Sequence, residues 1–412
     1  MDGNDNGLGL LSFQSYFRGY GWSRRGSSSF LGNGAKELKT ADNLVRPVAV
    51  YYHNLSQSGG AERMACALAS ELSCRGRTVH LVSWNTKGAA PFYRLNPSVS
   101  FSPLGTNKGW FGKIRKTLRL WRYLRDNRIH TLIGFVMSGD KSVYFAAKMA
   151  GTKIIVAERN APVMYALRQT RLERALIMRM LGTASRITVQ FSDYVKGYPD
   201  ALHSRIRVIH NPVQQSTHIA RPAEAQKGRF TLLALNRLDD FQKQVICLVE
   251  AFAEIAGEFP NWDLKIVGDG ADWEMIAKRI LELGANSQIT LIPQRQEIDE
   301  LFESAHLFVI PSRWEGFPNA LAEAMSHGLP AVGFEGCPGV SNLINDEGTG
   351  WLVPGNGDSS LLAQTLGRAM ESDLERERRG RSAREMMKQF DPAAQYDLWE
   401  SLLDEIECES SK

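Results

Sequence analysis

Residues 48–84 read VAVYYHNLSQSGGAERMACALASELSCRGRTVHLVSW. The first five letters form a short, β-rich apolar run, and a polar loop with two adjacent glycines follows it. Apolar residues at helical spacing come next, before VHLVSW gives a second β-rich run. Strand, loop, helix and strand in this order predict a βαβ unit, which is typical of doubly wound α/β folds.

The same alternation continues along the chain and starts again in its second half. TLIGFV, KIIVAE and RITVQ are further strand candidates in the first half, and helical patterns separate them. From residue 229 onward, the strand candidates are FTLLALN, LKIVGDG, ITLI, LFVIP and PAVGF. We therefore expect two Rossmann-like, doubly wound domains in tandem, with an interdomain cleft where open α/β sheets bind ligands.

The predicted domain boundaries follow from these patterns and from composition. Residues 1–45, rich in Gly, Ser and Asn, predict a disordered or loosely attached extension. The N-terminal domain is expected at 46–212 and the C-terminal domain at 229–390, with a polar linker at 213–228. Residues 391–412 have helical spacing, and such a helix could pack back on the first domain.

Length, composition and charge limit the class of protein. The 412 residues are 43% hydrophobic and 23% charged, as in globular proteins of more than one domain. Without an apolar run of 18 residues or a secretory leader, the chain is expected to be cytoplasmic. Through Pro212 it holds 31 Lys and Arg against 12 Asp and Glu, a balance of +19. The remaining 18 basic and 33 acidic residues give −15, so the halves should have different partners, an anionic one for the first half.

A candidate functional segment, SRWEGFPNALAEAMSHGLP, occupies residues 312–330. It leaves a predicted strand as a loop and enters a helix, which Asn319 is placed to cap before Ala320. The free N–H groups and the dipole at a helix N-terminus suit a phosphate. Glu315 lies in the loop and Glu323 in the first helical turns, so one carboxylate can reach a sugar and the other can bind ribose hydroxyls. A Glu in such a loop is also often a capping or surface residue.

The run E-G-F-P-N-A-L-A-E, followed by E-A-M-S-H-G-L-P, resembles the signature of the large retaining GT-B family called glycosyl transferases group 1. That family includes mannosyl-, galactosyl- and N-acetylgalactosaminyltransferases of bacterial surface polysaccharides, and the resemblance extends from about Val48 to the end. It implies a GT-B fold, a hexosyltransferase and a UDP- or GDP-sugar donor. The donor-binding residues it implies are Gly60, Gly268, Gly270, Glu315, Gly316, Phe317, Pro318, Asn319, Ala320, Leu321 and Glu323.

Three further segments extend the resemblance. N-R-L-D-D-F-Q-K is similar to a G-R-L segment with a following Lys that holds the donor pyrophosphate, although Asn236 replaces the usual Gly. It implies that Arg237 and Lys243 are phosphate clamps and, with Glu315, the catalytic residues. S-G-G-A-E-R is similar to the Gly-rich loop of the family, and E-R-N-A-P to a segment near its cleft. The stretch GFVMSGDKS lacks the His that many relatives carry there. The acceptor-side residues so implied are Gly59, Ser138, Asp140, Glu158, Arg159 and Asn160.

A basic stretch begins at Lys108 and ends at Arg128, with eight Lys or Arg and one acid. Its apolar residues share one face at helical spacing: Trp110, Phe111, Ile114, Leu118, Trp121 and Leu124. Such a helix can lie on an anionic inner membrane face or bind a lipid pyrophosphate. A solvated helix that covers its own core explains the pattern equally well. In the membrane interpretation, an exposed face carries Lys113, Arg115, Lys116 and Arg119.

The leading hypothesis is transfer of a sugar from UDP- or GDP-sugar to a lipid-linked or polysaccharide acceptor, with the retention of configuration that the resemblance implies. The chain has no Asp-x-Asp triplet and no clustered metal ligands, so we expect no metal cofactor, and no nucleic-acid partner is expected. One alternative is a nucleotide-sugar epimerase of the same fold, and another is a non-catalytic sugar-nucleotide-binding or scaffold protein. A dinucleotide oxidoreductase is less favoured, because G-x-G-x-x-G is absent.

Overall fold

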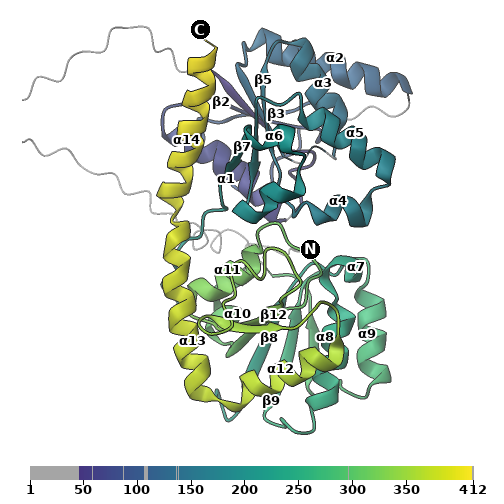
Figure 1. Cartoon of the computed structure of the whole chain (residues 1–412), viewed down its shortest axis with the longest axis vertical. Helices are drawn as coiled ribbons and strands as arrows, with labels where there is room; N and C mark the ends of the chain where they lie inside the picture. The colour runs from purple at the N-terminus through teal and green to yellow at the C-terminus, as the bar shows by residue number, and fades with distance from the viewer. Residues whose placement is uncertain are drawn as a thin grey trace, which may run out of the picture.

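The computed structural model describes residues 46–57, 59–86, 88–105, 110–135, 137, 139–295 and 297–410. The extension predicted at 1–45 lies outside these residues, as do Ser138 and Lys108. Figure 1 shows two α/β units, one above the other, with the C-terminal helices running along both.

Within the described residues, the N-terminal sheet has seven parallel strands in the order β3-β2-β1-β4-β5-β6-β7. The strands are β1 (Val48–Tyr51), β2 (Val79–Ser83), β3 (Ser100–Pro103), β4 (Thr131–Phe135), β5 (Lys153–Ala157), β6 (Arg186–Val189) and β7 (Ile206–Val208). The helical segments are α1 (Gly60–Cys74), α2 (Trp110–Asp126), α3 (Lys141–Met149), α4 (Val163–Arg168), α5 (Arg171–Leu181), η1 (Ser192–Gly197) and α6 (Asp200–His203).

The C-terminal sheet, counted over the part of the chain that the structure describes, has six parallel strands in the order β10-β9-β8-β11-β12-β13. They are β8 (Phe230–Leu235), β9 (Trp262–Val267), β10 (Ile289–Ile292), β11 (Leu307–Ile310), β12 (Ala331–Phe334) and β13 (Gly350–Val353). The helices are α7 (Asp240–Lys243), α8 (Val245–Ile255), α9 (Trp273–Glu282), α10 (Asp299–Glu303), α11 (Asn319–Ser326), α12 (Ser359–Glu371), α13 (Asp373–Met386), η2 (Met387–Phe390) and α14 (Pro392–Glu409).

Both sheets are doubly wound, which confirms the predicted fold class. The strand order reverses between β1 and β4 in the first sheet and between β8 and β11 in the second. Parallel strands covered by helices on both faces are buried throughout, as β1 is along its whole length. This explains why β1 appears in the sequence as a continuous apolar run instead of an alternating one. Ligands of such folds bind at the carboxyl ends of the strands beside the reversal.

The last helix, α14, packs against the N-terminal domain (Figure 1). Its Trp399 and Leu403 are buried in one cluster with Val50 and Leu72. Arg77 forms ion pairs with three acidic residues of α14, and Arg186 and Arg207 both pair with Glu405. Part of the positive charge of the first half is therefore balanced inside the protein, and it is not all available to an anionic partner.

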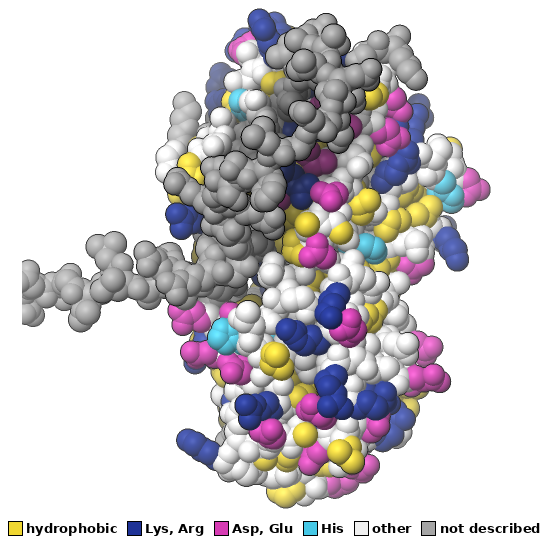
Figure 2. Space-filling view, turned by 90° about the vertical axis from the view of Figure 1, so that its left-hand side faces the viewer, with side chains coloured by type: hydrophobic (Ala, Val, Ile, Leu, Met, Phe, Trp, Pro, Cys, Tyr) yellow, Lys and Arg dark blue, Asp and Glu magenta, His cyan; other side chains and the backbone are white. Residues whose placement is uncertain are grey.

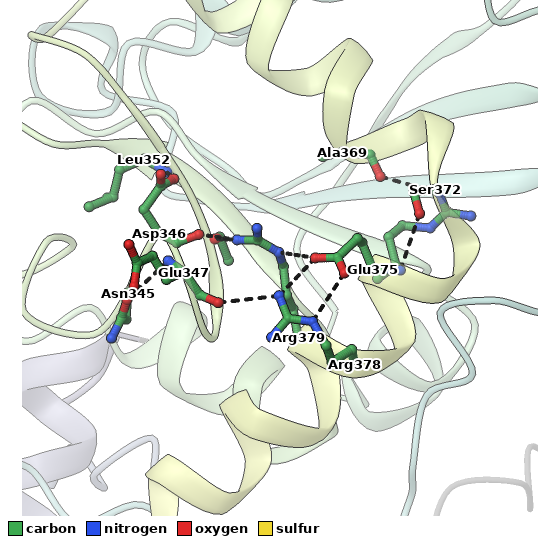
Figure 3. A network of polar contacts seen from close by, with 11 residues as sticks. Asn345, Asp346, Glu347, Leu352, Ala369, Ser372, Glu375, Arg378 and Arg379 are labelled. Carbon is green, nitrogen blue, oxygen red and sulfur yellow. Dashed lines mark hydrogen bonds and ion pairs between the residues drawn. The ribbon is translucent and has the colours of Figure 1, made fainter.

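Helix α13 is fixed to the loop between β12 and β13 by a network of polar contacts (Figure 3). The guanidinium of Arg379 donates to the carbonyl oxygens of Asp346 and Gly350, and that of Arg378 donates to the carbonyl oxygen of Glu347 at 3.2 Å. Hydrogen bonds from Arg378 and Arg379 lower the pKa of the Glu375 carboxyl to about 2. On this side of the C-terminal domain, cationic and acidic side chains alternate over the surface (Figure 2).

Candidate active site between the two domains

The loops that carry the predicted site residues meet at the seam between the domains. A Cβ on Gly316, in the loop after β11, would overlap the carbonyl oxygen of Arg159, which follows β5. A Cβ on Gly60, at the start of α1, would lie 2.8 Å from the side-chain amide of Asn319 in α11. Gly316 is therefore needed for the close approach of the domains, whereas at Gly60 only the Asn319 side chain would have to shift.

The Glu315 carboxylate is held firmly in the loop between β11 and α11. It is buried, accepts a hydrogen bond from the Ser312 hydroxyl at 2.6 Å and forms an ion pair with the Lys243 ammonium. From the other domain, the Tyr194 hydroxyl donates to the carbonyl oxygens of Glu315 at 2.7 Å and of Gly316 at 3.0 Å. Two residues predicted to act together thus contact each other, and Tyr194 fixes their loop.

Arg237 lies at the same edge but is held more loosely than Lys243. Its side chain is 65% exposed, and its nearest partners, Asp239 and Gln242, are both at 3.5 Å. Across the seam it faces Glu62 and Tyr52 of the N-terminal domain. Burial raises the pKa of the Glu62 carboxyl, although the Tyr52 hydroxyl and the Arg237 guanidinium act in the opposite direction. An exposed guanidinium beside a cleft is free to bind a ligand.

The Glu323 carboxylate, expected to bind ribose, forms an ion pair with Arg63 of α1. Both side chains are about a quarter exposed, at 23% and 24%. The pair joins the two domains directly across their seam. Neither Arg63 nor Glu62 was predicted as a site residue, and their position directly after the Gly59–Gly60 pair is the only signal in the sequence.

The remaining donor-loop residues lie where the motif requires, but several have packing roles. Phe317 stacks on Phe191 of the N-terminal domain at 5.5 Å, and Leu321 is buried in the core, whereas Ala320 is half-buried. The prediction that Asn319 caps the helix is wrong. Pro318 occupies the N-cap position without a side-chain bond, and the Asn319 amide accepts a hydrogen bond from Asn211 at 2.8 Å instead.

Gly268 and Gly270, predicted to admit the donor, are needed by the protein itself. A Cβ on Gly268, which has a φ of 156°, would overlap the carbonyl oxygen of Asn236, and one on Gly270 would overlap that of Leu238. The loop after β9 therefore packs tightly against the segment that carries Arg237. The Asn236 side chain is buried there, and neither its amide oxygen nor its amide nitrogen has a hydrogen-bond partner.

Two of the predicted acceptor-side residues lie inside the N-terminal domain and not at the seam. Glu158 is buried inside the N-terminal domain, where it accepts hydrogen bonds from the Met137 amide at 3.1 Å and the Tyr165 hydroxyl at 2.6 Å. Asp140 caps α3 and forms an ion pair with Lys116. These two carboxylates stabilise their own domain.

Other acceptor-side candidates do lie at the seam. The Arg159 backbone and Asn160 back the Gly316 loop, and Gly59 donates its N–H to the Tyr93 hydroxyl at 3.2 Å. Ser138 is outside the described residues. Over the ranges that the structure describes, no group of three or more His, Cys, Asp or Glu side chains is arranged to hold a metal ion.

Comparison with known proteins identifies the enzyme class. Residues 216–386, which carry Arg237, Lys243, Glu315 and Glu323, match the family described as glycosyl transferases group 1. The amylovoran biosynthesis glycosyltransferase AmsD of Erwinia amylovora is 24% identical over 356 residues, which cover 85% of this chain and 97% of AmsD. The chain is a glycosyltransferase, and residues 216–386 carry its similarity to group 1.

Two further similarities extend along most of the chain. One is to the GalNAc-α-(1→4)-GalNAc-α-(1→3)-diNAcBac-PP-undecaprenol α-1,4-N-acetyl-D-galactosaminyltransferase of Campylobacter jejuni, 23% identical over 362 residues, or 85% of this chain and 96% of that one. The other is to the crystal structure of Anabaena HepE with UDP and glucose, which superposes with a TM-score of 0.73 at 15% identity, covering 87% of this chain and 100% of HepE. The GT-B fold is thereby confirmed, and a glycosyltransferase is favoured over an epimerase, a scaffold protein or an oxidoreductase.

Proposed function

We propose that this glycosyltransferase moves a hexosyl group from a UDP- or GDP-sugar to a lipid-linked or polysaccharide acceptor in the synthesis of a cell-surface polysaccharide. The observation that carries the proposal is the Lys243–Glu315 pair, held at the seam by Ser312 and by Tyr194 of the other domain. It is a preorganised charged group at the carboxyl end of a parallel sheet, where a diphosphate would lie.

The chemistry of the reaction explains these residues. When the anomeric bond breaks, negative charge develops on the leaving nucleoside diphosphate. The Lys243 ammonium and the exposed Arg237 guanidinium are placed to stabilise that charge, and a guanidinium can bind two phosphate oxygens at once. The N-terminus of α11 adds free N–H groups beside them. Retention of the anomeric configuration, and a reaction that needs no metal, are part of the proposal through the resemblance to the family.

Glu323 provides the second half of the donor site in this proposal. A carboxylate accepts hydrogen bonds from the two ribose hydroxyls of a nucleotide, and such contacts fix the base end of the donor. In the structure, Arg63 occupies that carboxylate. Binding of the donor ribose must therefore exchange the ion pair for hydroxyl hydrogen bonds, and the Arg63 guanidinium is released into the cleft beside Gly60.

The acceptor is proposed to reach the N-terminal domain from an anionic membrane surface. The named acceptor of the Campylobacter relative is linked to undecaprenol through a diphosphate. In α2, Ile114 is 47% exposed among the exposed cations Lys113, Arg115 and Arg122. In the neighbouring α3, Phe145 is 60% exposed. Apolar side chains among cations are typical of helices that lie on anionic lipid. No helix among the described residues is long and apolar enough to cross a bilayer.

The structure corrects one detail of that surface. Lys116 and Arg119 were expected on its exposed face, but Lys116 is paired with Asp140 and Arg119 donates to the carbonyl oxygen of Leu104. Leu124 is buried and Trp121 packs against the core, so α2 also covers its own domain. The lipid-facing part of the helix is therefore restricted to its outer side.

The proposed activity is tested with a panel of UDP- and GDP-sugars. Release of nucleoside diphosphate should be detectable for one donor, and it should rise when a prenyl-diphosphate-linked sugar is added as acceptor. The anomeric configuration of the product is read from its NMR coupling constants. Absence of turnover with every donor would contradict the proposed transfer from a UDP- or GDP-sugar. A product of inverted configuration would contradict the proposed retention.

A further inference from the structure

Arg159 is half-buried, and two nitrogen atoms of its guanidinium are shielded from solvent without a hydrogen-bond partner. Its Nε and Nη1 atoms are shielded from solvent and donate to no partner, while Nη2 donates to the side-chain oxygen of Asn211. Phe135 lies beneath it, 5.1 Å from the ring centroid, and no carboxylate of the described residues forms an ion pair with it. Burial lowers the pKa of Arg159 to about 10, so the side chain remains cationic at neutral pH.

The adjacent strand ends carry more polar atoms in the same condition. The β5–β6 register pairs Ala157 with Thr188, so Arg159 and Gln190 each follow by two residues at the carboxyl ends of adjacent strands. Gln190 is 1% exposed, and neither its amide oxygen nor its amide nitrogen has a partner. His210, after β7, has an unpartnered Nδ1. Buried polar groups are satisfied in the large majority of cases, so neighbouring exceptions at a ligand-binding edge indicate a missing ligand.

The same guanidinium is linked to the donor loop. Asn211 accepts from Arg159 and donates to Asn319, the first residue of α11, at 2.8 Å. The carbonyl oxygen of Arg159 lies against Gly316, next to Glu315. A group bound at Arg159 would therefore lie at the inner end of the cleft, next to the helix N-terminus and within the reach of both domains.

We propose that Arg159 and Gln190 form a phosphate seat at the interdomain seam, in which the guanidinium supplies the charge and the Gln190 amide a further hydrogen bond. A phosphate group matches the planar donors of a guanidinium and removes the cost of an uncompensated buried charge. The inference deepens the proposed function, because the phosphate belongs to the donor diphosphate or to a lipid diphosphate acceptor.

The test uses Arg159→Met, because Met is of similar length but apolar. Inorganic diphosphate at low ionic strength should raise the melting temperature of the full-length wild-type protein. Arg159→Met should bind diphosphate at least tenfold more weakly by calorimetric titration, and without diphosphate it should melt no lower than wild type, since an unpaired buried charge is gone. Arg179→Met, a matched control that removes an exposed cation of α5, should keep the response. Equal diphosphate affinity in Arg159→Met and wild type would overturn the seat.

A second variant keeps the test decisive if Arg159→Met does not fold. Asn211→Asp places a carboxylate against the guanidinium, so it should raise the melting temperature and weaken diphosphate binding. Unchanged binding in that variant would also overturn the proposal. Competition then identifies the source of the phosphate: UDP or GDP displaces diphosphate from wild type if the donor supplies it, and a short prenyl diphosphate does so if the acceptor supplies it. A protein that binds inorganic diphosphate through Arg159 but turns over no sugar nucleotide would contradict the proposed function and leave the seat intact.

Discussion

In the C-terminal domain, Lys243 and Glu315 are already paired with each other, and the Ser312 hydroxyl donates a hydrogen bond to the same carboxylate. In the N-terminal domain, Nε and Nη1 of the half-buried Arg159 have no hydrogen-bond partner, and the buried Gln190 amide is also unsatisfied. A paired edge keeps its geometry without ligand, so it suits groups that must be in place when the bond breaks. An edge with unsatisfied groups is stabilised only when a ligand arrives, so it suits substrate capture and domain closure.

The largest effect is expected from removing Lys243, the cation paired with Glu315. Lys243→Ala should reduce kcat by about 10²–10³, the cost of losing one preorganised electrostatic group. Arg237→Ala should cost less, because Arg237 is exposed and its contacts are long. Steady-state kinetics measure both effects, and Lys278→Ala, an exposed lysine of α9, provides a control that should retain wild-type turnover. If Lys243→Ala turns over normally, the pair is structural.

Some residues at the seam could be predicted from the sequence and others could not, and the difference has a physical cause. Glu315, Glu323 and Lys243 belong to short contiguous segments, in which a loop and a helix start fix the side chains locally. Arg63 and Tyr194 act through partners 260 and 121 residues away, so nothing local marks them.

Glu158 and Arg159 show what a strand pattern leaves open. They are consecutive residues after β5, and because side chains alternate along an extended chain, one points into the domain and the other to the seam. Both were predicted as acceptor-side residues. The sequence indicates that a polar pair follows the strand, but it does not show which of the two side chains points to the seam. The doubly wound fold itself depends on patterns repeated over many residues, and for that reason its central strands could be predicted. The edge strands β3, β7 and β13 were not among the strand candidates.

A second prediction concerns the outer surface of the N-terminal domain. Changing Lys113, Arg115 and Arg122 of α2 together to Gln should weaken binding to anionic liposomes roughly a hundredfold at low salt, because each cation near the surface adds about 1 kcal/mol. Salt should reduce the difference, and flotation assays measure it. Folding should survive, since all three side chains are exposed. The same binding by the triple variant and wild type at low salt would mean that α2 only covers its own domain.

The third prediction separates the two members of the ion pair that crosses the cleft. Glu323→Ala should weaken nucleoside diphosphate binding by about 1.5–3 kcal/mol, the contribution of hydrogen bonds to a charged group. Arg63→Met frees the Glu323 carboxylate from its partner, so it should strengthen nucleotide binding or leave it unchanged. Calorimetric titration with UDP and GDP compares the variants. If Arg63→Met weakens binding as much as Glu323→Ala does, Arg63 itself holds the nucleotide and the exchange described above is wrong.

The smallest effect concerns Glu158, the buried carboxylate that is satisfied inside its own domain. Burial raises the pKa of Glu158 in the folded protein above its ordinary value. The protonated form is thus favoured by folding, and this stability is present below the unfolded pKa and is lost as the pH rises through the folded one. Glu158→Gln cannot ionise, and its amide can keep the hydrogen bonds with Met137 and Tyr165. Its melting temperature should exceed that of wild type at pH 8, by about 2–4 °C for each kcal/mol gained, and the difference should shrink toward pH 5. A constant difference across this range would show that folding does not raise the pKa of Glu158 and that its carboxylate stays ionised inside the domain.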